Sequence, residues 1–176
     1  GTKYALELDI KHFYDSIKPQ YVMDRMRQLI KDGNALRLIE TLIHDGILIG
    51  FYFSQWFANT LLQPLDRLIR ESGLCSHYLR YMDNFSIFGS NKRKLKKLFH
   101  RIEEWLNAHD LQIKENWQLF RITDRRMPNA LGYRYGRGFT FIRKNTLLRI
   151  KRKLKVMYRT IDFGGKLRIK TVNGMI

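Results

Sequence analysis

Two short stretches of the sequence each place an aspartate at the end of an alternating apolar run. The first stretch is ALELDIKHFY, residues 5–14, in which Asp9 directly follows Leu8. The second is HYLRYMDNFSIFG, residues 77–89, in which Asp83 lies between two apolar runs. Alternation that includes β-branched and aromatic residues is typical of strands. We therefore expect one strand and one tight hairpin, each with a carboxylate at its tip.

Such a pair of carboxylates could bind magnesium if both strands delivered them to the same edge of one sheet. Mg²⁺ is held in proteins by one or two carboxylates and takes its other ligands from water and substrate phosphates. Two such ions roughly 3.5 to 4 Å apart stabilise the attacking and leaving oxygens of an in-line phosphoryl transfer. Asp9 and Asp83 together thus indicate polymerase or nuclease chemistry, although an Asp-Asn turn taken alone is more often only a turn.

The charge balance narrows the class of partner. The chain of 176 residues has 33 Lys and Arg against 16 Asp and Glu, a net charge of +17, which predicts a polyanionic partner. A membrane is disfavoured, because no run approaches 18 consecutive apolar residues and no signal peptide opens the chain. The single cysteine, Cys75, excludes an internal disulfide or a cysteine-based metal site. We expect an intracellular, cytoplasmic protein that binds nucleic acid.

Helix signals fill most of the remaining sequence. Proline at a first helical position, Asn or Ser at an N-cap and glycine past a C-terminus mark helix ends. These signals predict amphipathic helices that begin near Pro19, Asn34, Ser54 and Asn91. We expect the first helix to bury Leu29 on its apolar side. Further short strands are expected at residues 111–114, 117–122, 130–135 and 139–142.

The last third of the chain carries most of the positive charge. Between Arg125 and Ile176 lie fifteen basic residues and one acidic residue, Asp162, so this third contributes +14 of the total of +17. A helix from about Thr146 would carry an apolar stripe of Leu147, Ile150, Leu154 and Met157. A helix with one sign of charge repels itself unless a partner neutralises it, so we expect it to bind phosphate backbone.

Five motifs, in this order, resemble those of the palm of reverse transcriptases. They are DIKHFY at Asp9, GxxxSQxxAN at Gly50, YMDN at Tyr81, LNAHDLQIKEN at Leu106 and ALGY at Ala130. The resemblance covers nearly the whole chain and implies an α+β polymerase palm, with an antiparallel, ferredoxin-like or RRM-like sheet packed on helices. It implies a palm over residues 1–143, the basic start of a helical thumb over residues 144–176, and fingers that are absent from this chain.

The resemblance also implies residue roles. Asp9, Asp83 and Asn84 correspond to the catalytic positions, and Asp9, Ile10 and Asp83 to the metal-binding ones. The nucleotide-binding positions would be Ile10, Phe13, Tyr14, Ile49, Gly50, Ser54 and Gln55, with Tyr14 as the steric gate against a 2′-hydroxyl. The primer and nucleic-acid positions would be Tyr81, Met82, Leu131, Gly132, Tyr133, Arg149, Lys151, Arg152 and Lys155.

The same resemblance implies two Mg²⁺ ions, with Mn²⁺ as an alternative. It also implies an RNA template, a DNA primer and deoxynucleoside triphosphates, and it allows an accessory protein.

Two departures from the family pattern matter. Asn84 stands where the family usually has a second aspartate, which leaves open a catalytically silent nucleic-acid-binding palm. The run from Ile49 to Gln55 is similar to the [IVL]GxxxSQ form of diversity-generating retroelement enzymes, which implies a bacterial or phage origin. An RNA-directed RNA polymerase built on the same palm is the third reading.

Overall fold

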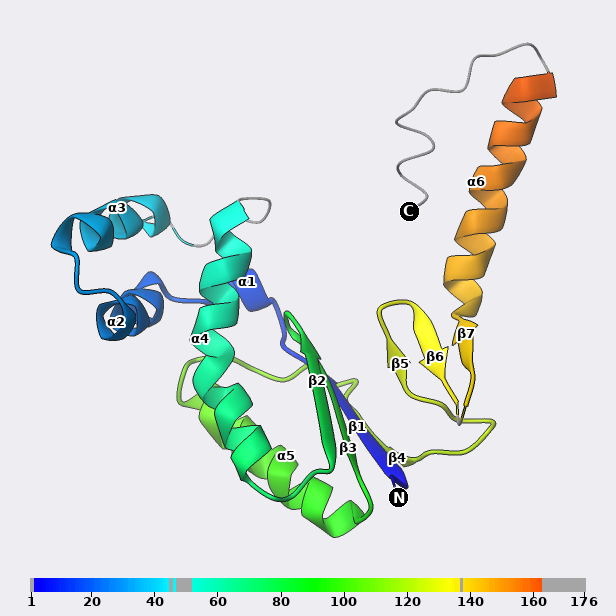
Figure 1. Cartoon of the computed structure of the whole chain (residues 1–176), viewed down its shortest axis with the longest axis horizontal. Helices are drawn as coiled ribbons and strands as arrows, with labels where there is room; N and C mark the ends of the chain where they lie inside the picture. The colour runs from blue at the N-terminus through cyan, green and yellow to red at the C-terminus, as the bar shows by residue number, and fades with distance from the viewer. Residues whose placement is uncertain (1, 45, 47–51, 137, 163–176) are drawn as a thin grey trace. The chain divides into compact units, whose positions relative to one another are not determined.

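The computed structural model describes residues 2–44, 46, 52–136 and 138–162, and Figure 1 traces these elements along the chain. The chain divides into two compact units, Gly1–Ile122 and Thr123–Ile176. The predicted boundary between palm and thumb after residue 143 is a different division, which no observation tests, and it stays a prediction.

The first unit contains a four-stranded antiparallel sheet. Its strands are β1 (Tyr4–Asp9), β2 (His77–Tyr81), β3 (Asn84–Gly89) and β4 (Gln118–Arg121). The spatial order is β2-β3-β1-β4, and every neighbouring pair is antiparallel. With helices between β1 and β2 and between β3 and β4, this is the ferredoxin-like arrangement. The predicted fold class is therefore confirmed.

Five helices accompany this sheet. They are α1 (Phe13–Ser16), α2 (Pro19–Leu29), α3 (Gly33–Ile43), α4 (Tyr52–Glu71) and α5 (Lys92–Asn107). Helix α5 packs on β1, β3 and β4, while α4 contacts both α5 and α2, so α4 and α5 cover one side of the sheet (Figure 1). The short α1, which follows β1 directly, was not predicted from the sequence.

Apolar residues at matching spacing build the core between the helices and the sheet. On α5, Leu95, Leu98, Ile102 and Leu106 are all 0% exposed, which is the spacing of one helix face. On the sheet, Leu6 lies opposite Ile87, and both are fully buried. Because burial of such a side chain contributes roughly 1.5–3 kcal/mol, this face fixes the register that also aligns the strand ends.

The N-terminal caps of α5 and α3 differ in how well the sequence predicted them. Asn91 is the N-cap of α5 as predicted, and its side chain accepts hydrogen bonds from the amides of Arg93 at 2.8 Å and Lys94 at 3.3 Å. The predicted cap of α3 was wrong. Asp32 is the N-cap there and accepts from the amide of Asn34 at 2.7 Å, because an aspartate one position ahead of Gly33 can satisfy the free amides of the first turn.

Two further expectations for the helices were wrong. Helix α4 begins at Tyr52, so Ser54 lies inside its first turn rather than at its cap. Helix α2 begins at Pro19 as predicted, but Leu29 is its last residue and is 49% exposed, because the buried side of the helix consists of Val22, Met23 and Met26. The predicted strand at residues 111–114 is only an isolated bridge between Ile10 and Ile113.

The second unit is a small sheet followed by a helix. Its elements are β5 (Asn129–Ala130), β6 (Tyr133–Tyr135), β7 (Thr140–Ile142) and α6 (Lys144–Asp162), with the three strands antiparallel. The strand predicted at residues 130–135 is thus two strands. Leu131 and Gly132 have φ of 52° and 85° and make the turn between them, the signs that a two-residue hairpin turn of type I′ requires.

Helix α6 begins two residues before the predicted Thr146. Its predicted apolar stripe is not buried, since Leu147 is 39% and Leu154 is 50% exposed. Polar and apolar side chains of α6 therefore both lie at the surface of the described part of this unit. None of the helices within the described ranges is both long enough and apolar enough to cross a membrane.

Candidate active site

The sheet brings Asp9 and Asp83 to the same edge. Asp9 is the last residue of β1, and Asp83 lies in the turn between β2 and β3. The register places Asp9 opposite Asn84, the residue after Asp83, and the amide of Ile10 donates to the Asp83 carbonyl oxygen at 3.1 Å. The side chain of Asp9 also acts directly on the pKa of Asp83. The two carboxylates therefore lie close together at adjacent strand ends.

The turn that carries Asp83 has an unusual backbone. Met82, the residue before Asp83, has φ of 53°, whereas Asp83 and Asn84 do not have positive φ. Aspartate and asparagine tolerate left-handed backbone better than methionine does. Met82 takes this conformation although an unbranched apolar side chain gives no local compensation for it.

The electrostatics of the pair reflect burial first and crowding of negative charge second. Burial raises the pKa of Asp83 above its ordinary value, and the neighbouring charge of Asp9 raises this pKa further. A backbone hydrogen bond and the charge of Lys114 act in the opposite direction but do not cancel the rise. A carboxyl whose pKa is raised in this way lies in a site with more negative charge than its surroundings stabilise.

Lys114 is the cation of this site, and the sequence had not singled it out. Its ammonium lies 2.5 Å from Asp9 Oδ1, and its amide donates to the Asp9 carbonyl oxygen at 2.8 Å. The bridge from Ile10 to Ile113 aligns the Lys114 segment beside β1, and only this long-range pairing reveals its role.

Asn84 contributes a donor where the usual family pattern would place another carboxylate. Its side-chain amide donates to Asp83 Oδ1 at 3.2 Å. A second aspartate at this position would instead add a like charge beside Asp83 and Asp9. The asparagine therefore holds one oxygen of Asp83 and leaves Asp9 and Asp83 as the carboxylates of the pair.

The arrangement fits a magnesium site that substrate would complete. Asp9 offers a buried oxygen that is paired with the Lys114 ammonium, and Asp83 offers a partly buried carboxylate next to it. Within residues 2–44, 46, 52–136 and 138–162, no group of three or more His, Cys, Asp or Glu side chains could hold a metal by itself. Mg²⁺ commonly binds through one or two carboxylates together with water and phosphate oxygens, and this donor set matches that mode.

Tyr14 lies close to the carboxylate pair. Burial raises the pKa of its hydroxyl, and the charges of Asp83 and Tyr81 raise this pKa further, so the phenol stays protonated. The effect of Asp83 and Tyr81 shows that the hydroxyl lies near the turn. Phe13 anchors the short α1 that carries Tyr14: its ring is 3% exposed and lies 5.4 Å from the Tyr14 ring. Ile10 is fully buried and Phe13 nearly so, so neither presents its side chain to a ligand.

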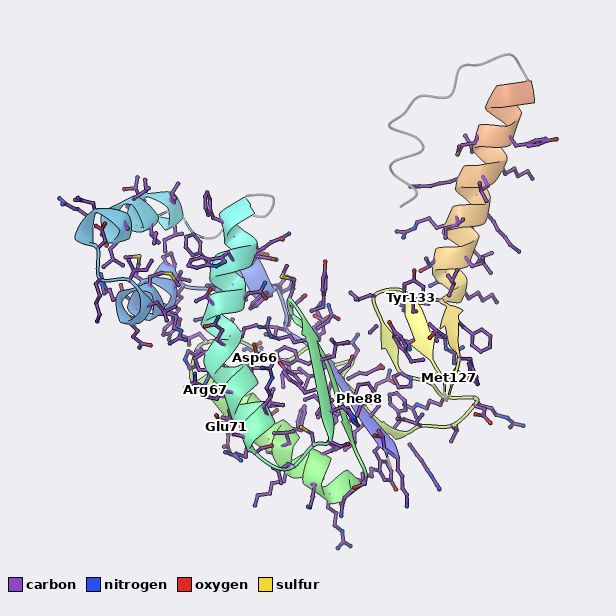
Figure 2. The ribbon with its side chains drawn as sticks, viewed as in Figure 1. Asp66, Arg67, Glu71, Phe88, Met127 and Tyr133 are labelled. Atoms are coloured by element: carbon purple, nitrogen blue, oxygen red, sulfur yellow. The ribbon has the colours of Figure 1, made fainter. Side chains whose placement is uncertain are left out.

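The other predicted site residues are distributed over several elements. Ser54 is buried and Gln55 exposed on α4, whereas Ile49 and Gly50 lie outside the described residues. Tyr81 ends β2 and is 55% exposed. Those of the second unit are Leu131, Gly132 and Tyr133 at the hairpin and the exposed Arg149, Lys151, Arg152 and Lys155 on α6. Figure 2 marks Asp66 on α4 and Tyr133 on the hairpin.

Comparison with known proteins agrees with this geometry. Residues 1–134 match the family described as Reverse transcriptase (RNA-dependent DNA polymerase). The chain belongs to this family. No match was found among curated proteins. The predicted family is therefore confirmed, whereas the similarity to diversity-generating retroelement enzymes is not tested and stays a prediction.

Two solved structures share the fold. The apo telomerase from Candida Tropicalis superposes with a TM-score of 0.62 at 15% identity, over 76% of this chain and 31% of that one. The same telomerase truncated from its C-terminal domain gives a TM-score of 0.63 at 17% identity, over 75% of this chain and 33% of that one. The chain thus spans about a third of the length of these structures, and the likeness concerns the fold alone.

Proposed function

We propose that this chain is the catalytic palm of an RNA-directed DNA polymerase, in which Asp9 and Asp83 hold two Mg²⁺ ions for nucleotidyl transfer. The supporting observation is the convergence of these two carboxylates at one sheet edge, where Lys114 pairs with Asp9 and the pKa of Asp83 is raised. Mn²⁺ is the alternative ion. The substrates in this proposal are an RNA template, a DNA primer and deoxynucleoside triphosphates.

The proposed reaction forms one bond and breaks another at the α-phosphorus of the nucleotide. The primer 3′-hydroxyl group loses its proton to water as its oxygen bonds to this phosphorus, and pyrophosphate leaves with the electrons of the broken P–O bond. Bound magnesium would supply the positive charge that stabilises the attacking and leaving oxygens. Asn84 restrains Asp83 through its amide, while Lys114 neutralises part of the charge on Asp9. The backbone of Ile10 is the third metal-binding position in this proposal.

Tyr14 selects deoxynucleotides in the same proposal. Its ring lies near Asp83 and Tyr81, at the edge where the sugar of a nucleotide bound to the carboxylate pair would lie. Phe13 holds α1 in the core, and Ser54 and Gln55 lie in the first turn of α4. A rigid aromatic ring beside the sugar would exclude a 2′-hydroxyl by steric contact.

The second unit is proposed to hold the nucleic acid. Leu131, Gly132 and Tyr133 would position the primer end, and the exposed basic side chains of α6 would contact phosphates without reading sequence. The same proposal includes fingers supplied by another part of a longer protein and an accessory protein. It also includes a cytoplasmic location and a bacterial or phage origin, with the diversity-generating type of motif.

Primer extension on an RNA template by the complete natural protein tests this function. We expect Asp9→Asn to lower the rate at least about 10²–10³-fold, the range seen when one group that stabilises transition-state charge is removed. Asp24→Asn, which removes a surface carboxylate paired with Arg27, is the matched control. Equal rates for wild type and Asp9→Asn, with nucleic-acid binding intact, would instead favour the silent palm.

The RNA polymerase reading is separated by Tyr14→Ala. A deoxynucleotide enzyme should gain ribonucleotide incorporation when the ring is removed, because the steric exclusion of the 2′-hydroxyl disappears. An enzyme that already uses ribonucleotides should show no such gain. The ratio of ribonucleotide to deoxynucleotide kcat/KM is the quantity to compare.

A further inference from the structure

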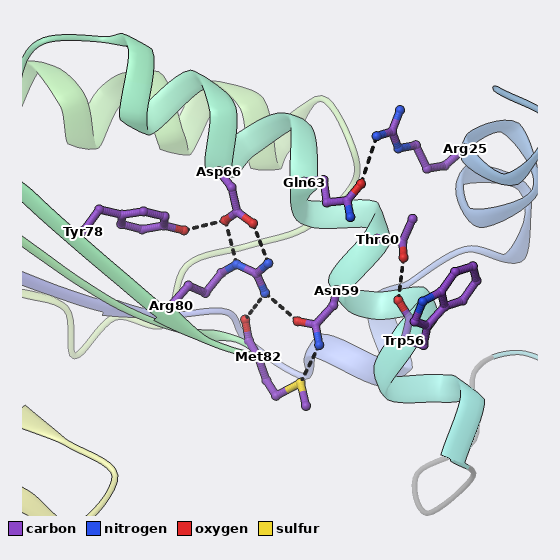
Figure 3. A network of polar contacts seen from close by, with 9 residues as sticks. All are labelled: Arg25, Trp56, Asn59, Thr60, Gln63, Asp66, Tyr78, Arg80 and Met82. Carbon is purple, nitrogen blue, oxygen red and sulfur yellow. Dashed lines mark hydrogen bonds and ion pairs between the residues drawn. The ribbon is translucent and has the colours of Figure 1, made fainter. Parts of the chain in front are cut away.

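A buried network of polar side chains joins α4 to the hairpin that carries Asp83 (Figure 3). The guanidinium of Arg80, on β2, donates from Nε to Asp66 Oδ1 at 2.7 Å and from Nη2 to Asp66 Oδ2 at 2.6 Å. Tyr78 donates its hydroxyl hydrogen to Asp66 Oδ1 at 2.6 Å. Asp66, on α4, therefore binds the guanidinium through both oxygens, the geometry in which an Arg side chain is most firmly oriented.

The third nitrogen of the same guanidinium reaches the turn. Arg80 Nη1 donates to the backbone oxygen of Met82 at 3.0 Å and to Asn59 Oδ1 at 2.7 Å. Asn59, on α4, donates from Nδ2 to Met82 Sδ at 3.4 Å. Met82 is thus held through both its backbone and its side chain, directly before Asp83 in the sequence.

Met82 is the residue of this hairpin that most needs external support. Its φ of 53° is a left-handed conformation that side chains other than Gly, Asn and Asp seldom adopt. Such conformations persist when the surrounding structure over-determines them, and they cluster at functional sites. Arg80 and Asn59 supply contacts that hold Met82 in this conformation, because both bind Met82 from outside the turn.

Stability alone gives no reason for a charged pair at this position. The side chains of Arg80 and Asp66 are only 10% and 16% exposed. A buried ion pair commonly gives no more stability than apolar residues of the same volume, so its value lies in the geometry that it fixes. Tyr78 and Asp66 already join β2 to α4, and the Nη1 contacts of Arg80 add the connection to the turn.

We propose that Arg80 is a positioning residue for metal binding: anchored by Asp66 on α4, it fixes the Met82 turn so that the Asp83 carboxylate meets Asp9. This inference rests on the proposed function, since it assigns Arg80 to the same metal site. Arg80 does not touch the metal or the nucleotide in this account, and it acts through Met82 and Asp83.

The test compares Arg80→Met with Arg25→Met in the complete natural protein. Arg25, on α2, is a matched control because it also donates to α4, from Nη2 to Gln63 Oε1 at 3.1 Å, but makes no contact with the turn (Figure 3). Tyr78→Phe is a second control, which removes a bond to Asp66 and leaves both Nη1 contacts of Arg80. The measurements are terbium affinity, from luminescence with the metal alone, and hydrogen exchange at the Ile10 amide.

We expect Arg80→Met to weaken terbium binding about tenfold or more and to speed exchange of the Ile10 amide, which donates to the Asp83 carbonyl oxygen. Arg80→Lys should lie between wild type and Arg80→Met, because an ammonium cannot form the fork to Asp66 and also reach Met82. Arg25→Met and Tyr78→Phe should lower Tm without changing terbium affinity or the exchange rate of the Ile10 amide. In primer extension, kcat should fall while KM for the nucleotide changes little.

The inference would be overturned if Arg80→Met showed the same terbium affinity and the same Ile10 exchange rate as Arg25→Met. If Arg80→Met fails to fold, Arg80→Lys and Asn59→Ala provide the same comparison, and unchanged readouts in both would again overturn it. Failure of the proposed function is distinguishable, because it would appear as wild-type protein that does not extend primers. The exchange rate of the Ile10 amide needs no catalysis and tests the positioning separately.

Discussion

The turn at Met82 and the turn at Leu131 have the same backbone peculiarity and opposite surroundings. Met82 has φ of 53° and Leu131 has φ of 52°, so each hairpin places an apolar side chain in the left-handed region. Met82 is held by Arg80 and Asn59, whose side chains belong to a buried network. Leu131 is 58% exposed, and its turn is joined to the start of α6 by the amide of Arg143, which donates to Gly132.

Under the proposed function, this difference matches a separate task for each turn. A carboxylate that shares metal ions must lie within a fraction of an ångström of its place, so the elements around it must be fixed. A hairpin that meets a nucleic acid gains from an exposed apolar tip that can adjust to its partner. We therefore expect substitutions around Met82 to disturb the metal site, and those around Leu131 to change nucleic-acid binding.

The largest effect is expected from Asp66→Asn. This substitution leaves the guanidinium of Arg80 buried without its counter-charge, which typically lowers the free energy of unfolding by about 3–5 kcal/mol. Urea unfolding of the first unit measures it. Asp24→Asn, at an exposed ion pair, should cost no more than about 1 kcal/mol. If Asp66→Asn and Asp24→Asn lowered the free energy of unfolding by similar amounts, the buried network around Met82 would stabilise the protein no more than an exposed ion pair does.

A smaller effect is expected from Gly132→Ala at the second turn. Gly132 has φ of 85°, and an added Cβ would lie 3.2 Å from Thr146 Oγ1. The left-handed backbone alone should cost about 1–2 kcal/mol of unfolding free energy. Gly33→Ala is the control, since its Cβ would meet nothing within 4 Å and its φ is not positive. A loss of terbium affinity in Gly132→Ala would contradict the separation of the two turns.

The smallest effect is expected from Lys114→Met. Its ammonium is a cation that competes with a metal for Asp9, and its removal should tighten terbium binding. Because Lys114 is 40% exposed, solvent screens this pair, and the change should stay below about 1 kcal/mol, or roughly fivefold. Lys18→Met, at the exposed pair with Asp110, should leave the affinity unchanged. Weaker binding in Lys114→Met would mean that the lysine supports the metal site.

The sequence predicted those features that depend on local patterns. Alternation revealed β1 and the hairpin, and the side chain of Asn91 marked the start of α5 because an N-cap is a property of a few consecutive residues. The two alternating runs led to the pair of Asp9 and Asp83, and the order of the motifs led to the palm. Their meeting at one edge follows from the antiparallel register of β1 and β3.

The remainder depends on contacts between residues far apart in the chain. Arg80 has the pattern of an ordinary polar residue in an alternating strand, and its partner Asp66 lies fourteen positions earlier on a helix. Lys114 meets Asp9 only because an isolated bridge aligns their segments. The stripe of α6 that includes Leu154 had the spacing of a buried face, but periodicity states which side is apolar and not whether anything covers it.

A double-mutant cycle on metal affinity tests the shared carboxylate site most directly. Terbium affinity is measured for wild type, Asp9→Asn, Asp83→Asn and the double variant in the complete natural protein. If the two aspartates bind the same ions, each single substitution should remove most of the binding and the double variant should lose little more, a coupling on the order of 1 kcal/mol or greater. Independent, additive losses would contradict the account.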